Sequence, residues 1–267
     1  MTDTSNSLAG RFKKVIFGAL AVVLSVSAIA DQIEDNLRNS MTSVIDEIVQ
    51  ESKLSGPFES IARRSLENML NHDKMIANLA LFLRGQKLGS EQDARMIGLS
   101  AIGLLNGLAM SRLSQEDLFL LMKTQQEVTT KMTDFECAQY FRKQETNLNG
   151  RGRWVYEIAS TMGLERFAFL MRTTEKSFVL LREGRNEAEW QSAKEVDSIR
   201  TEFESNFRKF VRNNPHVLSF FNSGKTFATA PDAEVCRVGS ATFEFVLSGE
   251  KDVVKKRLHA YIKNQLF

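Results

Sequence analysis

Proline is scarce in this chain of 267 residues, occurring only at Pro57, Pro215 and Pro231. Proline removes a backbone donor and crowds the preceding turn, so its scarcity leaves long stretches free to be helical. Residues 237–247 hold several residues typical of strands, but a helix is the preferred interpretation there. The sequence therefore predicts an all-α fold, an irregular multi-helix bundle of about nine or ten helices.

An excess of charge of one sign is also absent. Lys and Arg total 35 against 33 Asp and Glu, a formal net charge of +2, and 43% of the residues are hydrophobic. Disorder requires low hydrophobicity and high net charge, so the chain is predicted to fold. The balanced total also argues against nucleic acid as a partner, because such binding depends on a strong basic field.

Cysteine occurs only twice, at Cys137 and Cys236. There is neither a C-x-x-C redox motif nor the paired Cys/His spacing of a structural zinc site, so we expect no metal and no cofactor. In an exported chain the two cysteines could form a disulfide. In the chain-entropy model, closing a loop of this length stabilises the folded state by about 4–5 kcal/mol. Two buried free thiols are the alternative, and the disulfide is the preferred interpretation.

A long apolar run is absent as well, but a short one lies near the start. Arg11, Lys13 and Lys14 precede the run Val15–Ala30, in which Ala28 and Ala30 stand before Asp31. A basic region, a short apolar core and an A-x-A site are typical of a secretory signal peptide. We therefore predict a signal peptide at residues 1–30, cleaved before Asp31, and no permanent membrane span in the mature chain.

The alternative for the same segment is an anchor. Val15–Ala30 could be retained in a bacterial inner membrane with the rest of the chain in the periplasm, although a spanning helix needs about 20 apolar residues. No cysteine lies near the predicted cleavage site, which excludes a lipid-anchored lipoprotein. The chain also lacks N-x-S/T sequons, as expected of a bacterial exported protein.

Helical periodicity runs through most of the remaining chain. Apolar residues at spacings of three and four predict helices near residues 32–52, at 58–83 with an interruption at Asn71–Asp73, and from Ser90 onward. Ser114 with Asp117 and Thr133 with Glu136 predict two further helix starts.

Loops divide the second half. Residues 146–152 read as a loop, and we place a boundary there between an N-terminal helical subdomain, 31–145, and a C-terminal one, 146–267. Helical regions at 153–182, with a bend at Gly163, and at 187–212 should form an antiparallel hairpin. After the loop at 222–231, a helix holds Cys236 and a last one starts near Glu250.

The two parts carry opposite charge. Residues 31–133 hold 11 basic and 14 acidic residues, whereas residues 134–267 hold 21 basic and 18 acidic ones. We therefore expect the parts to attract each other across one interface.

Catalytic motifs are missing. The chain has no G-x-S-x-G, H-E-x-x-H, Walker or EF-hand motif, and its three histidines are scattered. An envelope-acting hydrolase could use paired carboxylates or His72 placed by the fold, but neither has a distinguishing sequence pattern.

Two further segments are candidate ligand sites. Residues 96–110 carry no charge, and this helix could line a cavity for an apolar ligand through Ile97, Ala101, Leu104 and Leu108, although a buried central helix is the simpler interpretation. Arg151 and Arg153 could contact an anion beside Trp154.

The sequence thus favours an exported, non-enzymatic periplasmic or secreted protein that binds another protein or a cell-envelope component. An envelope hydrolase and a helical carrier for an apolar ligand are the alternatives, and the oligomeric state stays open.

Overall fold

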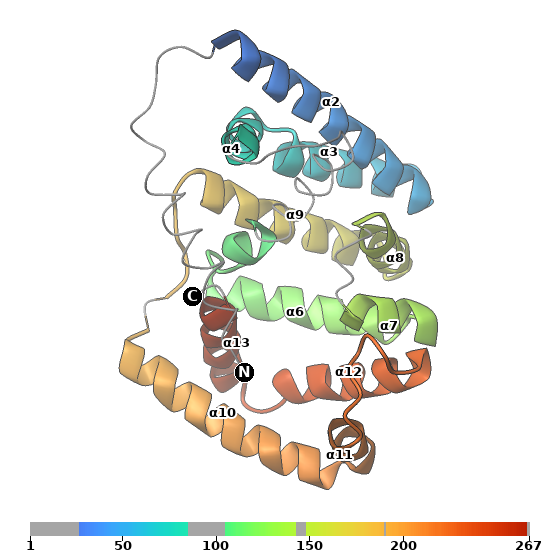
Figure 1. The fold of residues 1–267 in the computed structure, drawn as a ribbon, viewed down its shortest axis with the longest axis vertical. Coiled ribbons are helices and arrows are strands. Elements are labelled where there is room, and N and C mark those ends of the chain that lie inside the picture. Colours follow the sequence, from blue (N-terminus) through green and yellow to red (C-terminus); the bar gives the residue numbers. More distant parts are fainter. Residues whose placement is uncertain (1–26, 85–104, 143–147, 190, 266–267) are drawn as a thin grey trace.

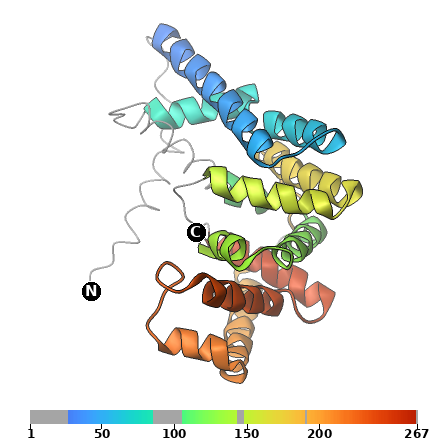
Figure 2. The same cartoon turned by 90° about the vertical axis from the view of Figure 1, so that its right-hand side faces the viewer.

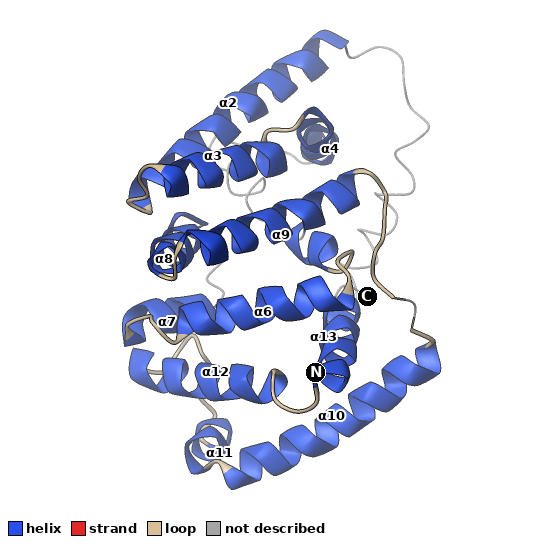
Figure 3. Cartoon of the chain, turned by 180° about the vertical axis from the view of Figure 1, so that it is seen from behind, coloured by secondary structure: helices blue, strands red, loops and turns tan. Residues whose placement is uncertain are grey.

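The computed structural model describes residues 27–84, 105–142, 148–189 and 191–265. Every regular element in this part of the chain is a helix, as Figure 3 shows, so the predicted all-α fold is confirmed. The helices are α2 (Ser27–Glu51), α3 (Pro57–Leu70), α4 (Asp73–Arg84), α6 (Gln115–Thr129), α7 (Asp134–Arg142), α8 (Leu148–Thr161), α9 (Leu164–Arg182), α10 (Ala193–Asn213), α11 (Pro215–Asn222), α12 (Asp232–Val246) and α13 (Lys251–Gln265).

The helices form an elongated stack of layers (Figures 1 and 2). At one end α2 lies on α3 and α4, and α3 packs on α9. Helices α8 and α9 pack on α6, which contacts α13, while α7 lies along α12. At the other end, α10 rests on α13 and α11 rests on α12. Each layer therefore buries apolar side chains against the next, and α10 with α11 forms an outer layer.

The order of the layers differs from the order of the chain. Helices α8 and α9 follow α7 in the sequence, yet α9 packs between α3 and α6 (Figure 1). The predicted boundary between residues 145 and 146 falls just before α8, so helices from its two sides alternate through the stack. The division into two subdomains stays a prediction.

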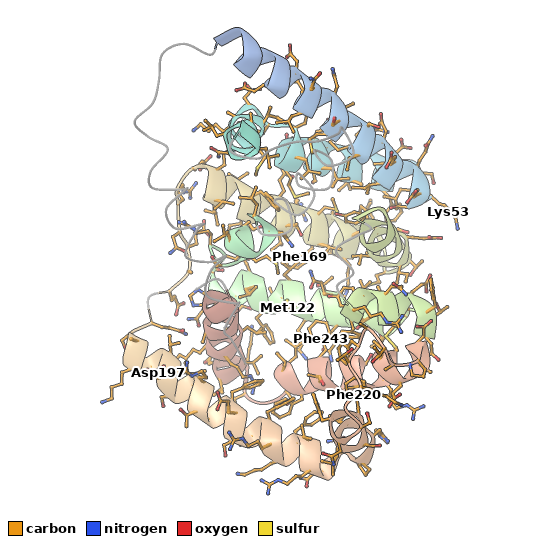
Figure 4. All side chains as sticks on the ribbon, viewed as in Figure 1. Lys53, Met122, Phe169, Asp197, Phe220 and Phe243 are labelled. Carbon is orange, nitrogen blue, oxygen red and sulfur yellow. A yellow bond between two sulfur atoms is a disulfide. The ribbon has the colours of Figure 1, made fainter. Side chains whose placement is uncertain are left out.

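Two groups of buried side chains hold the stack together. The larger one extends from α2 through α9 and α6 to α13, and it includes the fully buried Phe167. The smaller one joins α7, α11 and α12 around Val217 and Val235. Phe141 packs against both groups. Figure 4 shows Phe243, of the larger group, between α12 and α6, and Phe220, of the smaller one, between α11 and α12.

The capping signals in the sequence place several helix starts. The Ser114 hydroxyl accepts a hydrogen bond from the backbone N–H of Asp117 at 3.1 Å, at the start of α6. The Thr133 N–H donates to the Glu136 carboxylate at 2.8 Å, which begins α7. Both predicted caps are confirmed, because each side chain satisfies an N–H that has no partner inside the helix.

Two predicted boundaries are wrong. Residues 148–152, expected in a loop, form the first turn and a half of α8, whose apolar face packs on α2, α6 and α9. The second long helix starts at Ala193 instead of Glu187, because Ser192 and Glu195 form a capping box there. Gly163, expected as a bend, separates α8 from α9 with a φ of 95°, a conformation that glycine adopts without strain.

The expected hairpin between the two long helices is also wrong. Figure 1 shows α9 and α10 in different layers, with α10 resting on α13 and α11 instead. Residues 185–189, which follow the end of α9, are not helical, so the chain does not return along α9 in a short turn. A short turn would have returned the chain along α9.

Helix α2 begins before the predicted end of the signal peptide. Its first residue is Ser27, so Ala28, Ala30 and Asp31 lie in its first turns. Cleavage before Asp31 stays a prediction. Within the described residues, no helix is long and apolar enough to cross a membrane.

Ion pairs connect the acidic first part with the basic second part. Glu116 lies 2.6 Å from both Lys251 and Lys255, and Asp117 lies 2.8 Å from Lys176. Lys53 and Glu157 pair in the opposite sense at 3.1 Å. Exposed pairs of this kind contribute little to stability one by one.

Candidate interaction surface

Five phenylalanines meet at the surface of the outer layer. Phe203, Phe207 and Phe210 lie along one face of α10, Phe221 comes from α11, and Phe245 from α12. The Phe245 ring lies 5.6, 5.7 and 4.5 Å from the ring centres of Phe203, Phe207 and Phe210. Such distances are typical of interacting aromatic pairs. We call these five residues the aromatic cluster.

The aromatic cluster is not a closed core. Its four members on α10 and α12 are half-buried, and Phe221 exposes 52% of its surface. Along the whole of α10, Val196 is the one described residue that is buried. A long helix that leaves its apolar face partly exposed has apolar area to bury against a partner.

Arg257 of α13 contacts the aromatic cluster on the side that faces α13. Its guanidinium lies 5.6 Å from the ring centre of Phe203 and 5.9 Å from that of Phe245. It also donates to the carbonyl oxygens of Val246 and Ser248, at 2.6 Å each, near the C-terminal end of α12. Burial lowers the pKa of this guanidinium from its ordinary value. Arg257 thus holds α12, α13 and the start of the aromatic face of α10 together.

Polar contacts at the two ends of α10 set its direction. At its start, Gln191 donates to the backbone carbonyl of Lys256 at 3.3 Å. At its end, the Asn214 side chain donates to the Phe210 carbonyl at 2.7 Å, and Pro215 then opens α11. Because proline fixes its own φ and suits the first turn of a helix, α11 can start immediately at an angle to α10.

A groove runs where α10 meets α11. It has a volume of about 520 Å³ and is lined by Phe207, Arg208, Val211, Arg212 and Phe221. The apolar side chains come from both helices, and the two arginines come from α10. The groove therefore combines an apolar wall with a basic rim.

The basic rim is weakly neutralised. Glu204 lies 3.9 Å from Arg208, at the outer limit of an ion pair, and the Arg212 Nε donates to the Arg208 carbonyl oxygen. Helix α11 contains no acidic residue. Basic residues near the C-terminal end of α10 also suit the helix dipole, but the dipole gives no reason for aromatic rings to stay exposed.

The two cysteines form a disulfide, as predicted. Cys137 of α7 and Cys236 of α12 are bonded, with 5.2 Å between their Cα atoms. Arg142 strengthens the same contact: its guanidinium donates to the carbonyl oxygens of Phe227 and Ala230 and pairs with Asp232 at 2.6 Å. The disulfide and Arg142 thus hold α7, α12 and the loop before α12 together. Helix α11 and Phe245 are positioned by this part of the molecule.

His72, the predicted catalytic candidate, occupies a turn. It lies between α3 and α4, where its Nδ1 accepts a hydrogen bond from the Lys74 N–H at 3.2 Å. Beside it, Arg38 joins Asn71 and Asp73. These contacts give His72 a role in ending one helix and starting the next. They do not position a nucleophile against it.

The carboxyl groups whose pKa values are clearly shifted have lowered pKa values, so they are stronger acids than usual. Hydrogen bonds from Lys251 and Lys255 lower the pKa of Glu116, and a hydrogen bond from the Ser192 hydroxyl lowers that of Glu195. A general acid needs a raised pKa, so neither group suits that role. Among the described residues, no three His, Cys, Asp or Glu side chains gather as metal ligands would.

The other predicted ligand contacts are only partly described. Ile97, Ala101 and Leu104 lie outside the described residues, while Leu108 is half-buried in a helical segment that ends near Met110. Arg151 and Arg153 belong to α8, but their side chains lie outside the described part. Both ligand sites therefore stay predictions.

The groove itself was not predicted. The sequence predicts only that the helix at residues 187–212, which holds Phe203, Phe207 and Phe210, pairs with the preceding helix in a hairpin. The pattern that could have indicated a surface is the basic and aromatic run Arg208–Arg212, followed by Phe220 and Phe221 just after a proline.

Comparisons with known proteins give no further assignment: no family model, no curated protein and no solved structure matches this chain.

Proposed function

We propose that this protein is an exported, non-enzymatic binding protein that holds an acidic amphipathic segment of a partner protein in the groove between α10 and α11. The observation that carries the proposal is the partly exposed aromatic cluster, with Phe221 its most exposed member, beside the rim formed by Arg208 and Arg212. Aromatic residues and arginine are the residue types that dominate binding energy at protein interfaces.

The shape and charge of the groove favour one kind of occupant. A helix with apolar residues at positions i, i+3, i+4 and i+7 could place them against Phe207, Val211 and Phe221. Acidic residues flanking that stripe would lie near Arg208 and Arg212, where opposite charges steer association and fix orientation. A basic segment would meet repulsion at the same rim.

Export is the second part of the proposal. The disulfide between Cys137 and Cys236 supports it, because disulfides persist mainly in oxidising compartments such as the periplasm. The basic and apolar residues before Asp31 supply the secretory pattern. N-terminal sequencing of the exported protein should begin at Asp31. An intact N-terminus in the membrane fraction would instead favour the anchor formed by Val15–Ala30.

Peptide titration tests the binding. The probe is a fluorescent helical peptide of about eighteen residues, with leucines in one stripe and glutamates elsewhere, and its matched partner carries lysines in place of the glutamates. We expect the acidic peptide to bind at least about tenfold more tightly, a difference of about 1.4 kcal/mol.

Charge reversal makes the test specific. Arg208→Glu with Arg212→Glu should reverse the preference in favour of the lysine peptide, and Phe221→Ser should weaken both peptides. Leu164→Ser is the matched control, because Leu164 is an exposed apolar residue of α9, far from the groove along the chain. Equal binding of the two peptides, or an equal loss in the control, would refute the proposal.

A further inference from the structure

A second hollow lies where α3 packs on α9, in layers of the stack away from the groove between α10 and α11. It has a volume of about 610 Å³, which is within the range of small-molecule sites. Its apolar lining comes from both helices, through Ile61 of α3 and Ala168, Val179 and Leu180 of α9. None of these residues belongs to the groove between α10 and α11.

The carboxylates of this hollow are already engaged. Glu175 accepts hydrogen bonds from the Ser65 hydroxyl at 2.8 Å and from the Asn68 amide at 2.7 Å. Glu187 pairs with Lys176 at 2.6 Å and lies 3.6 Å from Arg185. These contacts join α3, α9 and the segment after α9 into a connected wall.

Lys176 is held in the same network. Its ammonium group lies 2.8 Å from Asp117 of α6 as well as against Glu187, and the hydrogen bonds to Asp117 and Glu187 raise its pKa. It therefore stays charged at neutral pH, but its charge is shared between two carboxylates of the protein. Lys176 therefore adds to the positive potential of the hollow, but the protein already uses its hydrogen-bond donors.

Two guanidiniums of the hollow differ from the rest. Arg64 of α3 and Arg172 of α9 both line it, and within the described residues neither has an ion pair or a hydrogen bond from its side chain. Both guanidiniums carry a positive charge beside the same apolar hollow, so an anion bound in the hollow would be attracted by both. A guanidinium binds carboxylate and phosphate oxygens through two parallel hydrogen bonds.

We propose that the hollow between α3 and α9 binds an amphiphilic anion: one carboxylate or phosphate headgroup, held by Arg64 and Arg172, on a short apolar body that lies against Ile61 and Val179. The headgroup supplies the charge that the two arginines lack in the protein. The apolar body of the ligand covers the apolar side chains of the hollow that the packing of α3 on α9 leaves partly exposed.

Calorimetric titration with four probes tests both parts of the ligand. Octyl phosphate and octanoate carry the two headgroups, octyl glucoside carries the apolar chain without charge, and inorganic phosphate carries the charge without the chain. We expect at least one of the two charged amphiphiles to bind about tenfold or more tightly than octyl glucoside and inorganic phosphate.

Variants locate the site. Arg64→Gln combined with Arg172→Gln should weaken that amphiphile about tenfold or more, while the thermal unfolding midpoint stays unchanged because both side chains are exposed. Arg200→Gln combined with Arg237→Gln is the matched control, since both arginines are exposed on α10 and α12.

Four results would overturn the proposal. Equal binding of octyl glucoside would show an apolar site only, and equal binding of inorganic phosphate would show a plain anion site. Unchanged binding in the Arg64 and Arg172 variant would place the ligand elsewhere. If neither charged amphiphile binds, the hollow is not a site for an amphiphilic anion.

Discussion

Single residues decide how closely the helices of this molecule approach. Gly239 lies in the middle of α12, where a Cβ atom would meet the Phe141 ring of α7, with its Cδ2 and Cγ at 2.3 and 2.4 Å. Glycine is unfavourable inside a helix by about 1 kcal/mol, so its presence there needs a reason in packing. The close contact between α7 and α12 supplies that reason.

The substitution Gly239→Ala should therefore destabilise the protein. We expect a loss of about 1–3 kcal/mol in the free energy of unfolding, measured by urea denaturation, because the Phe141 ring must move. The same substitution should cost less in a Phe141→Leu background, where the ring is gone. A gain of about 1 kcal/mol, as helix propensity alone would give, would contradict this packing.

Glu116 is the residue whose titration should be visible in stability. Hydrogen bonds from Lys251 and Lys255 lower its pKa in the folded state below its unfolded value. Its contribution to stability is therefore present above the unfolded pKa and is lost as the pH falls through the folded pKa.

Glu116→Gln should lower the urea midpoint by a small amount at neutral pH, and the difference from the unmodified protein should vanish as the pH falls through the folded pKa of Glu116. Glu244→Gln, an exposed residue of α12, is the matched control and should show no such dependence. A Glu116 difference that stays constant down to the lowest pH would rule out the ion pair as its cause.

At the scale of elements, local signals in the sequence predicted most helices correctly. Ser114 and Thr133 marked their helix starts because a cap depends only on neighbouring residues. Residues 148–152 were misread for the opposite reason: their asparagines and glycines favour a loop locally, but packing of α8 on its neighbours keeps them helical.

The strongest single link between two elements is the disulfide that joins α7 to α12. Replacing Cys137 and Cys236 by serine should lower the free energy of unfolding by up to about 4–5 kcal/mol, since the closed loop spans a sequence separation of 99. Chemical denaturation with and without a reductant measures the effect. The reductant should destabilise the unmodified protein and leave the serine variant unchanged; a similar effect on both would contradict a structural disulfide.

At the scale of the whole molecule, the order of the layers could not be predicted. Periodicity indicates which face of a helix is apolar but not which helix covers it. The sequence predicts that the helix holding Phe203, Phe207 and Phe210 pairs with α9 in a hairpin. In the structure α10 lies instead at the end of the stack, where its aromatic face meets Phe245 and stays partly exposed. The candidate surface is thus a product of topology, which local sequence signals do not contain.

Hydrogen–deuterium exchange with the acidic peptide tests the central claim most directly, because it locates the bound segment on the molecule. At saturating peptide, we predict slower exchange in α10 from Phe203 to Arg212 and in α11, with no change in α3 and α9. The lysine peptide should produce no such protection. Saturating binding of the acidic peptide without protection in α10 and α11, or with protection confined to other helices, would contradict the account.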